Sequence, residues 1–206
     1  MLFRSEDRAL REGQWQTPDV GFALQGKVLG ILGLGRLGTQ VAKIGQAIGM
    51  SVIAWSQNLT AERAAAEGCT RVEKADLFRL SDVLTVHVLS TERTRGLVGP
   101  AELALMKPTA FLINTARGPV LDEKAAIPVL AERRIAGAAL DVFEQEPVAQ
   151  DNPLLQMDNV LVTPHSICWT DEFFRNNAES AFRSVVAVAS GRTPTYVVNR
   201  DVLKHQ

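Results

Sequence analysis

The stretch "GKVLGILGLGRLGTQVAKIGQAIGM", residues 26–50, decides the fold. Its apolar run at 27–33 predicts a buried strand, and the periodic pattern at 36–49 predicts a helix. Between them, Gly33, Gly35 and Gly38 match G-x-G-x-x-G, in which the glycines permit a tight turn, close approach to a pyrophosphate and close helix–strand packing. Because the pattern joins a strand to a helix, it favours a dinucleotide phosphate site over a plain flexible turn.

The rest of the chain alternates apolar runs with helical patterns. Further strands are predicted at 51–55, 82–88, 109–115, 135–143 and 159–164, and helices at 60–68, 74–81, 99–106, 121–134 and 170–191. Pro128 lies inside one of these helices, so we expect a kink or break there. Strands that are apolar throughout and separated by helices indicate a parallel sheet covered on both faces. The predicted fold is a doubly wound α/β fold of the Rossmann type.

Composition excludes several classes of function. The 206 residues are 46% hydrophobic and 22% charged, with a formal net charge of -1, which provides no basic field for nucleic acid or a membrane surface. No apolar run approaches the roughly 20 residues that span a bilayer. Cys69 and Cys168 lie far apart without metal-type pairing, so we expect neither a disulfide nor a metal site, and a reducing cytoplasm is the default compartment.

The end of the second predicted strand bears on the choice of cofactor. An acidic residue at this point usually binds the adenosine ribose of NAD. Here Ser56 occupies that position, followed by Gln57, and the nearest arginine is Arg63 on the next helix. The small neutral loop tolerates NAD or NADP, so the choice stays open. In the alternative interpretation the loop is only a polar strand end, and backbone and water hold the ribose.

Three side chains of catalytic type follow predicted strands. Arg117, Glu146 and His165 each come just after the carboxyl end of a strand, where open α/β sheets bind their ligands. An arginine fork can hold a carboxylate and polarise a carbonyl, a histidine can pass a proton, and a glutamate can orient the imidazole. Each residue alone has a structural explanation, as a surface ion pair, a segment end or a strand cap. Their joint placement favours reduction of a 2-keto acid.

Four motifs together resemble one known family. They are "LGILGLGRLG" (29–38), "LMKPTAFLINTARGPVLDE" (105–123), "AALDVFEQEP" (138–147) and "NVLVTPHSICWT" (159–170). The chain is similar, over about residues 5 to 190, to the cofactor-binding part of a D-isomer-specific 2-hydroxyacid dehydrogenase. That family includes phosphoglycerate dehydrogenase, glyoxylate/hydroxypyruvate reductase and formate dehydrogenase.

The resemblance implies a role for each matching position. Arg117 would bind the substrate carboxylate and carbonyl, and Glu146 and His165 would form the acid–base dyad. Asp141 would meet the nicotinamide carboxamide, with Thr115 and Ala116 lining that side. The implied cofactor-binding residues are Gly33, Gly35, Arg36, Leu37, Gly38, Ser56, Gln57, Thr94, Thr115, Ala116, Asp141 and His165. The implied partners are a small 2-keto or 2-hydroxy acid and a second copy of the chain, paired through the cofactor domain.

The sequence departs from the family pattern around the site. The small residues that commonly follow the histidine are replaced here by Ile167 and Cys168, with Trp169 beyond. We therefore expect a narrower or differently shaped pocket, and the substrate stays unassigned. The loop "HVLSTERT" (87–94) lacks the family's proline, and we expect His87 to be a packed residue rather than a second base.

The domain organisation is predicted from the same resemblance. Residues 1–20 read as a lead-in helix and linker, 21–168 as the dinucleotide-binding domain, and 169–206 as a C-terminal helix and return segment. Only residues 1–26 precede the first strand, so most of the substrate lobe is expected to be missing and the activity of the chain alone to be low or absent. The alternatives to an enzyme are a non-catalytic dinucleotide-binding module and a truncated fragment.

Overall fold

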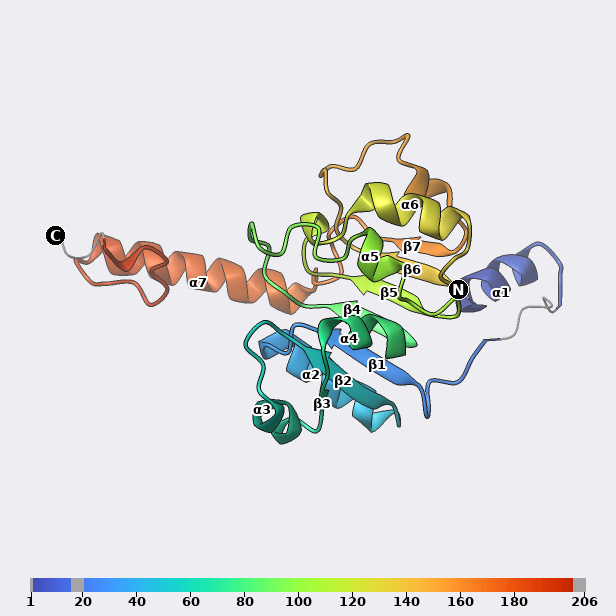
Figure 1. Ribbon diagram of the computed structural model, residues 1–206. Coiled ribbons are helices and arrows are strands. Elements are labelled where there is room, and N and C mark those ends of the chain that lie inside the picture. Colours follow the sequence, from blue (N-terminus) through green and yellow to red (C-terminus); the bar gives the residue numbers. More distant parts are fainter. Residues whose placement is uncertain (1, 16–20, 202–206) are drawn as a thin grey trace. The chain divides into compact units, whose positions relative to one another are not determined.

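The computed structural model describes residues 2–15 and 21–201, and its sheet contains seven strands in the order β3-β2-β1-β4-β5-β6-β7 (Figure 1). All neighbouring strands are parallel. The strands are β1 (Val28–Leu32), β2 (Ser51–Trp55), β3 (Thr70–Arg71), β4 (Val83–Val86), β5 (Phe111–Asn114), β6 (Gly137–Leu140) and β7 (Val160–Val162). The predicted doubly wound fold is therefore confirmed.

Helices connect the strands as parallel pairing requires. They are α1 (Leu2–Arg11), α2 (Arg36–Ala47), α3 (Ala61–Ala66), α4 (Lys74–Leu80), α5 (Pro100–Leu103), α6 (Glu123–Ala131) and α7 (Asp171–Ala189), with short 3-10 turns η1 (Gly118–Val120) and η2 (Pro153–Gln156). The predicted helices and strands are present, β2 with the predicted limits and the others with shorter ends. The elements β3, η1 and η2 were not predicted.

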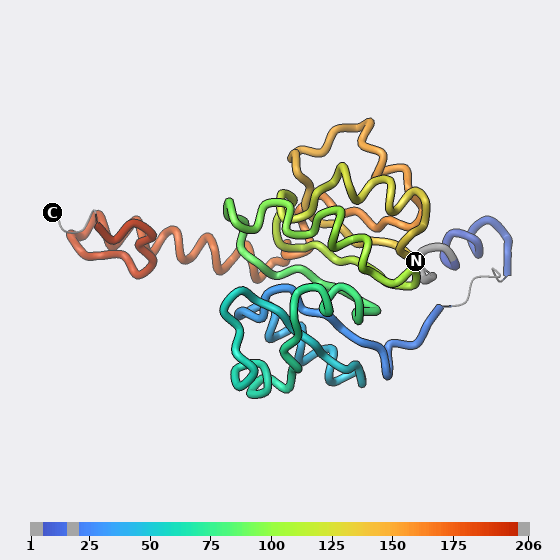
Figure 2. The backbone as a smooth tube through the Cα atoms, in the orientation of Figure 1, coloured from blue at the N-terminus to red at the C-terminus, as the bar shows by residue number. Residues whose placement is uncertain are grey.

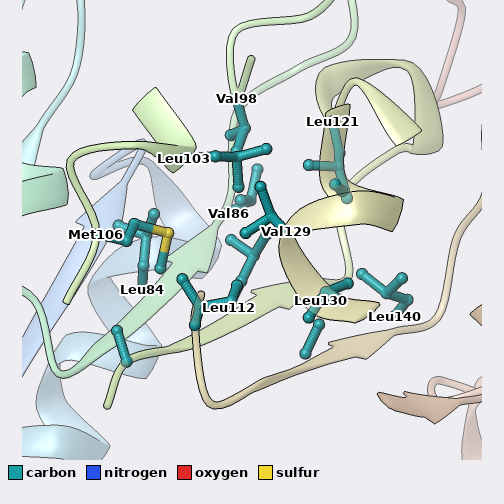
Figure 3. Close-up of a cluster of buried hydrophobic side chains, with 14 of the residues drawn as sticks. Leu84, Val86, Val98, Leu103, Met106, Leu112, Leu121, Val129, Leu130 and Leu140 are labelled. Atoms are coloured by element: carbon teal, nitrogen blue, oxygen red, sulfur yellow. The ribbon is translucent and has the colours of Figure 1, made fainter. Parts of the chain in front are cut away.

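Two hydrophobic clusters cover opposite faces of the sheet. Leu29 and Ile31 of β1 pack with residues of α2 and α3, whereas Leu32 packs with α4, α5 and α6, because successive strand residues point to opposite faces. Figure 3 shows the larger cluster, in which Leu112 of β5 and Leu130 of α6 are fully buried. Burial on both faces explains why the strands are apolar throughout.

The break expected at Pro128 does not occur. Helix α6 runs from Glu123 to Ala131, and the carbonyl oxygen of Pro128 accepts the Glu132 N–H at 3.0 Å. The carbonyl oxygen of Lys124 has no N–H partner at Pro128, and because Lys124 is exposed this oxygen can bond to water. The next two residues, Val129 and Leu130, are buried against the sheet, and their packing keeps the helix continuous.

Asp82 connects three elements at the amino ends of the central strands. One carboxylate oxygen accepts the N–H of Val28 at 2.8 Å, and the other accepts Nζ of Lys107 at 2.8 Å. Partial burial raises the pKa of Asp82, but these bonds and the nearby Lys107 charge outweigh it, so the pKa lies below its ordinary value. Asp82 therefore joins the start of β1 to the start of β4.

The described residues form two compact units that divide between His165 and Ser166. In the second unit, the Thr170 hydroxyl caps α7 by accepting the Phe173 N–H, and the helix ends before Gly191, whose φ is +67°. Figure 2 shows the following residues turning back along α7, where Thr195 and Tyr196 border a shallow polar pocket. The predicted glycine stop of this helix is confirmed.

Cys69 and Cys168 are both free thiols, and burial raises the pKa of the Cys69 thiol. None of the helices in the described ranges is long and apolar enough to cross a membrane.

Candidate active site

The turn after β1 requires glycine at its first position. Gly33 has φ +106°, a conformation that other residues rarely adopt, and its N–H donates to the Trp55 carbonyl oxygen at 2.8 Å. A Cβ atom built on Gly33 would lie 2.8 Å from the backbone carbon of His87. The turn therefore fits tightly between β2 and the residues after β4, as the glycine pattern predicts.

Gly35 and Gly38 have different surroundings. A Cβ atom on Gly38 would lie 2.2 Å from the carbonyl oxygen of Gly33, so a side chain there would push α2 away from the strand. A Cβ atom on Gly35 would meet nothing within 4 Å. Gly35 also caps α2 without a side-chain bond, and Arg36 and Leu37 are exposed. The helix thus presents an open, partially positive N-terminus, which fits a pyrophosphate.

Ser56 contacts the glycine turn directly. Its hydroxyl oxygen accepts the Leu34 N–H at 2.8 Å, so the residue at the end of β2 holds the turn from the side. Gln57 beside it is exposed. A serine that accepts this bond still has an O–H to donate, whereas a carboxylate at the same position would only accept.

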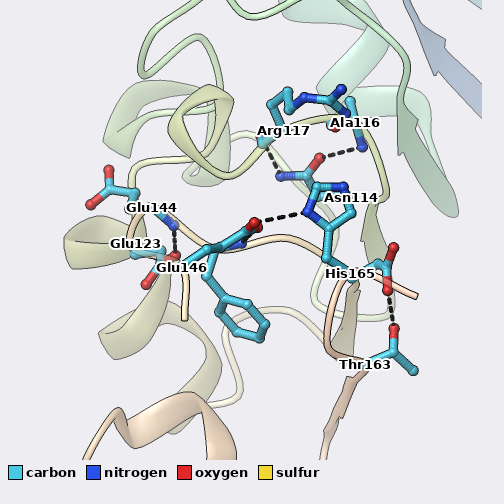
Figure 4. Close-up of polar contacts among 10 residues, drawn as sticks. Asn114, Ala116, Arg117, Glu123, Glu144, Glu146, Thr163 and His165 are labelled. Atoms are coloured by element: carbon cyan, nitrogen blue, oxygen red, sulfur yellow. Dashed lines mark hydrogen bonds and ion pairs between the residues drawn. The ribbon is translucent and has the colours of Figure 1, made fainter. Parts of the chain in front are cut away.

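His165 and Glu146 form a direct pair (Figure 4). His165 Nδ1 lies 2.8 Å from Glu146 Oε2, and Glu146 Oε1 accepts the Phe143 N–H at 3.0 Å. Partial burial raises the pKa of Glu146, but bonds from His165 and Phe143 and the charges of His165 and Arg117 outweigh it and leave the pKa below its ordinary value. Glu146 is therefore ionised near neutral pH and accepts the imidazole N–H.

The backbone holds His165 in an unusual conformation. Its φ is +53°, in the left-handed region, and its N–H donates to the Asp141 carbonyl oxygen at 2.8 Å. The Asp141 carboxylate is 3% exposed and accepts the Thr163 hydroxyl at 2.6 Å. Left-handed non-glycine residues cost roughly 1–3 kcal/mol and concentrate at functional sites, so the conformation itself marks this position.

Arg117 extends from the loop after β5. Asn114 is fully buried, and its side chain accepts the Ala116 N–H and donates to the Arg117 carbonyl oxygen, both at 3.1 Å. The Arg117 side chain is exposed, and its charge lowers the pKa of Glu146. The structure therefore brings the arginine, the glutamate and the histidine to one edge of the sheet, with Thr115 between β5 and the arginine.

Two other candidates have local partners. The Thr94 hydroxyl donates to the Leu89 carbonyl oxygen at 2.6 Å and accepts the Thr91 N–H at 2.8 Å, so it orders its own loop. His87 Nε2 lies 3.0 Å from the Thr85 hydroxyl, and burial lowers the pKa of the imidazole. A neutral, half-buried His87 agrees with the packed role expected for it. No group of three potential metal ligands occurs among the residues that the structure describes.

Comparisons with known proteins show the family to which the chain belongs. The sequence signature of the D-isomer specific 2-hydroxyacid dehydrogenase NAD binding domain matches residues 2–166. The chain belongs to the D-isomer-specific 2-hydroxyacid dehydrogenase family. It is 44% identical over 195 residues to the glyoxylate reductase of Aeropyrum pernix, and 40% identical over 194 residues to the D-3-phosphoglycerate dehydrogenase of Archaeoglobus fulgidus. These alignments cover 95% and 94% of this chain, but 58% and 37% of the two relatives.

Solved structures of the same family share the fold. The phosphoglycerate oxidoreductase of Vibrio cholerae superimposes with a TM-score of 0.85 at 33% identity, covering 91% of this chain and 61% of that one. The D-lactate dehydrogenase of Lactobacillus jensenii, solved with NAD+, gives a TM-score of 0.81 at 29% identity, covering 95% and 63%. The chain therefore spans less than two thirds of the length of these relatives.

Three residues next to Arg117 and to the loop that carries Glu146 were not predicted from the sequence. They are Asn114, Gly118 and Glu123. No charge pattern or spacing in the sequence indicates that these three residues belong to a site. They lie inside the motif that contains Arg117, so an inspection of each polar or glycine residue next to the arginine would have found them. Asn114 bonds within the loop after β5. Glu123 and Gly118 contact the loop after β6, which only the sheet order brings alongside.

Proposed function

We propose that this chain binds NAD or NADP and uses Arg117, Glu146 and His165 to interconvert a small 2-keto acid and its 2-hydroxy acid. The observation that carries the proposal is the 2.8 Å contact between His165 Nδ1 and Glu146 Oε2 beside Arg117. These three residues follow strands of the same sheet whose central turn carries the glycine pattern. Parallel α/β sheets bind their ligands at this edge.

The first step of the proposed activity is cofactor binding. Backbone N–H groups at Arg36 and Leu37, next to the open space at Gly35, would hold the pyrophosphate. Ser56 and Gln57 would meet the adenosine ribose. On the other side of the site, Thr94, Thr115, Ala116 and Asp141 are the candidates for the nicotinamide end. When bound, the nicotinamide supplies the hydride.

The chain's own side chains would supply the acid–base chemistry. Because Glu146 accepts the bond from His165 Nδ1, the opposite nitrogen, Nε2, is left to hand a proton to the keto oxygen and to remove it in the reverse direction. The Arg117 guanidinium would bind the substrate carboxylate and stabilise negative charge on the carbonyl oxygen. Ionised Glu146 would hold the imidazole through its Nδ1 side and keep Nε2 free for the substrate.

We further propose that NAD and NADP bind with similar affinity. The Ser56 hydroxyl oxygen accepts the Leu34 N–H, so its O–H would be available to donate to a ribose oxygen or to a 2′-phosphate. A carboxylate here would repel the phosphate. The division at 168/169, the homodimer and the cytoplasmic compartment stay predictions, which rest on the family resemblance and on the cysteine content.

The experiment is a fluorescence titration with NADH and with NADPH. It is followed by a single-turnover measurement of the oxidation of the bound reduced cofactor after glyoxylate or hydroxypyruvate is added. We expect saturable binding, with dissociation constants for the two cofactors within about tenfold of each other. NADH oxidation by this chain alone is expected to be slow, and His165→Ala should slow it further by roughly 10²–10⁴, the range for a lost general acid. Binding without oxidation would support the non-catalytic module instead, and absence of binding would refute the proposal.

A further inference from the structure

A buried carboxylate lies behind the acid–base pair and has no part in the chemistry proposed above. Glu123 is the first residue of α6 and is 9% exposed. The helix does not need it as a cap, because the Asp122 side chain already accepts the Ala125 N–H at 3.0 Å. A buried carboxylate is costly unless its oxygens are bonded, so its partners should explain why it is there.

Both oxygens of Glu123 bind the loop after β6. Oε1 accepts the Glu144 N–H in a short contact, and Oε2 lies 3.3 Å from Asn152 Nδ2. Asn152 is itself fixed, because its Oδ1 accepts the Leu154 N–H at 3.0 Å at the start of η2. Glu123 thus holds the loop that carries Glu146 at two points, Glu144 before it and Asn152 after it in the sequence. Figure 4 shows the first of these contacts.

The loop passes this constraint to the dyad. The residue before Glu144 is Phe143, whose N–H donates to Glu146 Oε1, and the other oxygen of Glu146 contacts His165. A Cβ atom on Gly118 would lie 1.7 Å from the Phe143 carbonyl oxygen, so η1 supports the same peptide from a second side. A shift of the 143–144 peptide would therefore move the Glu146 carboxylate.

We propose that Glu123 is a positioning residue, which sets the place of the Glu146 carboxylate under His165 through the 143–144 peptide. The inference rests on the proposed function of the dyad. The position requires a carboxylate rather than an amide, because both partners of Glu123 are donors. In Glu123→Gln the new NH₂ group would face either the Glu144 N–H or the Asn152 NH₂ group, and one bond would be lost.

The test uses NMR on the 206-residue chain without cofactor. It measures the Glu146 carboxyl pKa by ¹³C titration and the exchange of the Phe143 N–H with solvent. In Glu123→Ala and Glu123→Gln we expect the Glu146 pKa to rise toward its ordinary value and Phe143 exchange to accelerate by about tenfold, as for one lost bond to a charged group. Glu132→Gln, on an exposed glutamate at the end of the same helix, should change neither.

A double variant separates positioning from a general loss of structure. In Glu123→Gln/Asn152→Asp the new amide can donate to the new carboxylate and still accept the Glu144 N–H, so both readouts should return to within about twofold of wild type. If Glu123→Ala does not fold, the Glu146 pKa and the Phe143 exchange rate in Glu123→Gln and in the double variant test the proposal. An unchanged Glu146 pKa in a folded Glu123 variant, or failure of the double variant to restore it, would overturn the proposal.

Cofactor binding distinguishes this inference from the proposed function. The NADH dissociation constant should stay within about twofold in every folded Glu123 variant, because none of them touches the glycine turn. If wild type does not bind NADH, the proposed function fails, yet the Glu146 titration still reports whether Glu123 positions the carboxylate.

Discussion

A methyl group at Gly35 would enter open space, whereas one at Gly38 would lie 2.2 Å from the Gly33 carbonyl oxygen. The two alanine variants should therefore separate dinucleotide binding from folding. Gly35→Ala loses a favourable N-cap, which costs up to about 1 kcal/mol, but alanine restricts the unfolded chain and recovers roughly 0.4–1 kcal/mol at an allowed φ. We expect its stability to stay within about 1 kcal/mol of wild type.

The same methyl group would occupy the space through which a pyrophosphate reaches the backbone. Hydrogen bonds to a charged group contribute about 1.5–3 kcal/mol each, so losing one should raise the NADH dissociation constant by at least about tenfold. Gly38→Ala should instead lower the free energy of unfolding by at least about 1 kcal/mol, because moving backbone costs more than the roughly 1 kcal/mol of helix propensity that alanine gains.

Urea unfolding and NADH fluorescence titration of both variants measure the two effects separately. Wild-type affinity in Gly35→Ala would show that the diphosphate does not approach the chain at this turn. Wild-type stability in Gly38→Ala would show that α2 can move outward freely, and the close-packing argument would be wrong.

Three further predictions concern pH, the core and the sheet. Glu146 has a pKa below its ordinary 4.5, so the stability it contributes is complete above that value and is lost as the pH falls through the lower folded pKa. The difference in urea midpoint between wild type and Glu146→Gln should shrink below about pH 4.5, and a difference that does not change with pH would contradict the pairing with His165. Leu130→Ala should lower the free energy of unfolding by about 2–5 kcal/mol, because the side chain is fully buried; a loss under about 1 kcal/mol would mean that the core closes around the cavity. Asp82→Ala should cost about 1–3 kcal/mol in the same assay, because a backbone donor and Lys107 lose their acceptor, and no change would show that water replaces the carboxylate.

Much of the fold could be predicted because its signals are local. The run at 51–55 is apolar and bounded by turn residues, and β2 has the predicted limits. The two-residue strand β3 was missed because Thr70 and Arg71 are exposed and have no apolar period of their own. A kink or a break was expected at Pro128, and the helix does not break there, because the burial of Val129 and Leu130 outweighs the propensity of one residue.

In the candidate site, too, the residues with a local sequence signal could be predicted, and the contacts that depend on the fold could not. Arg117, Glu146 and His165 could be named because each directly follows a strand, and parallel strands end at one edge. The contact between Ser56 and the Leu34 N–H could not be inferred, since it depends on the path of a turn between two paired strands. Glu123 was missed for a related reason, because its partners lie on a loop that becomes its neighbour only after β5 and β6 pair.

The absence of a side chain at Gly118 has a consequence for engineering this enzyme family. The peptide after Arg117 lies directly against the peptide that precedes Glu144, with no room for a methyl group between them. A movement of one of these two segments should therefore displace the other. A transplant of the arginine loop from a relative with another substrate preference should succeed only when the facing segment is exchanged with it, and the two should be inherited together in natural variants.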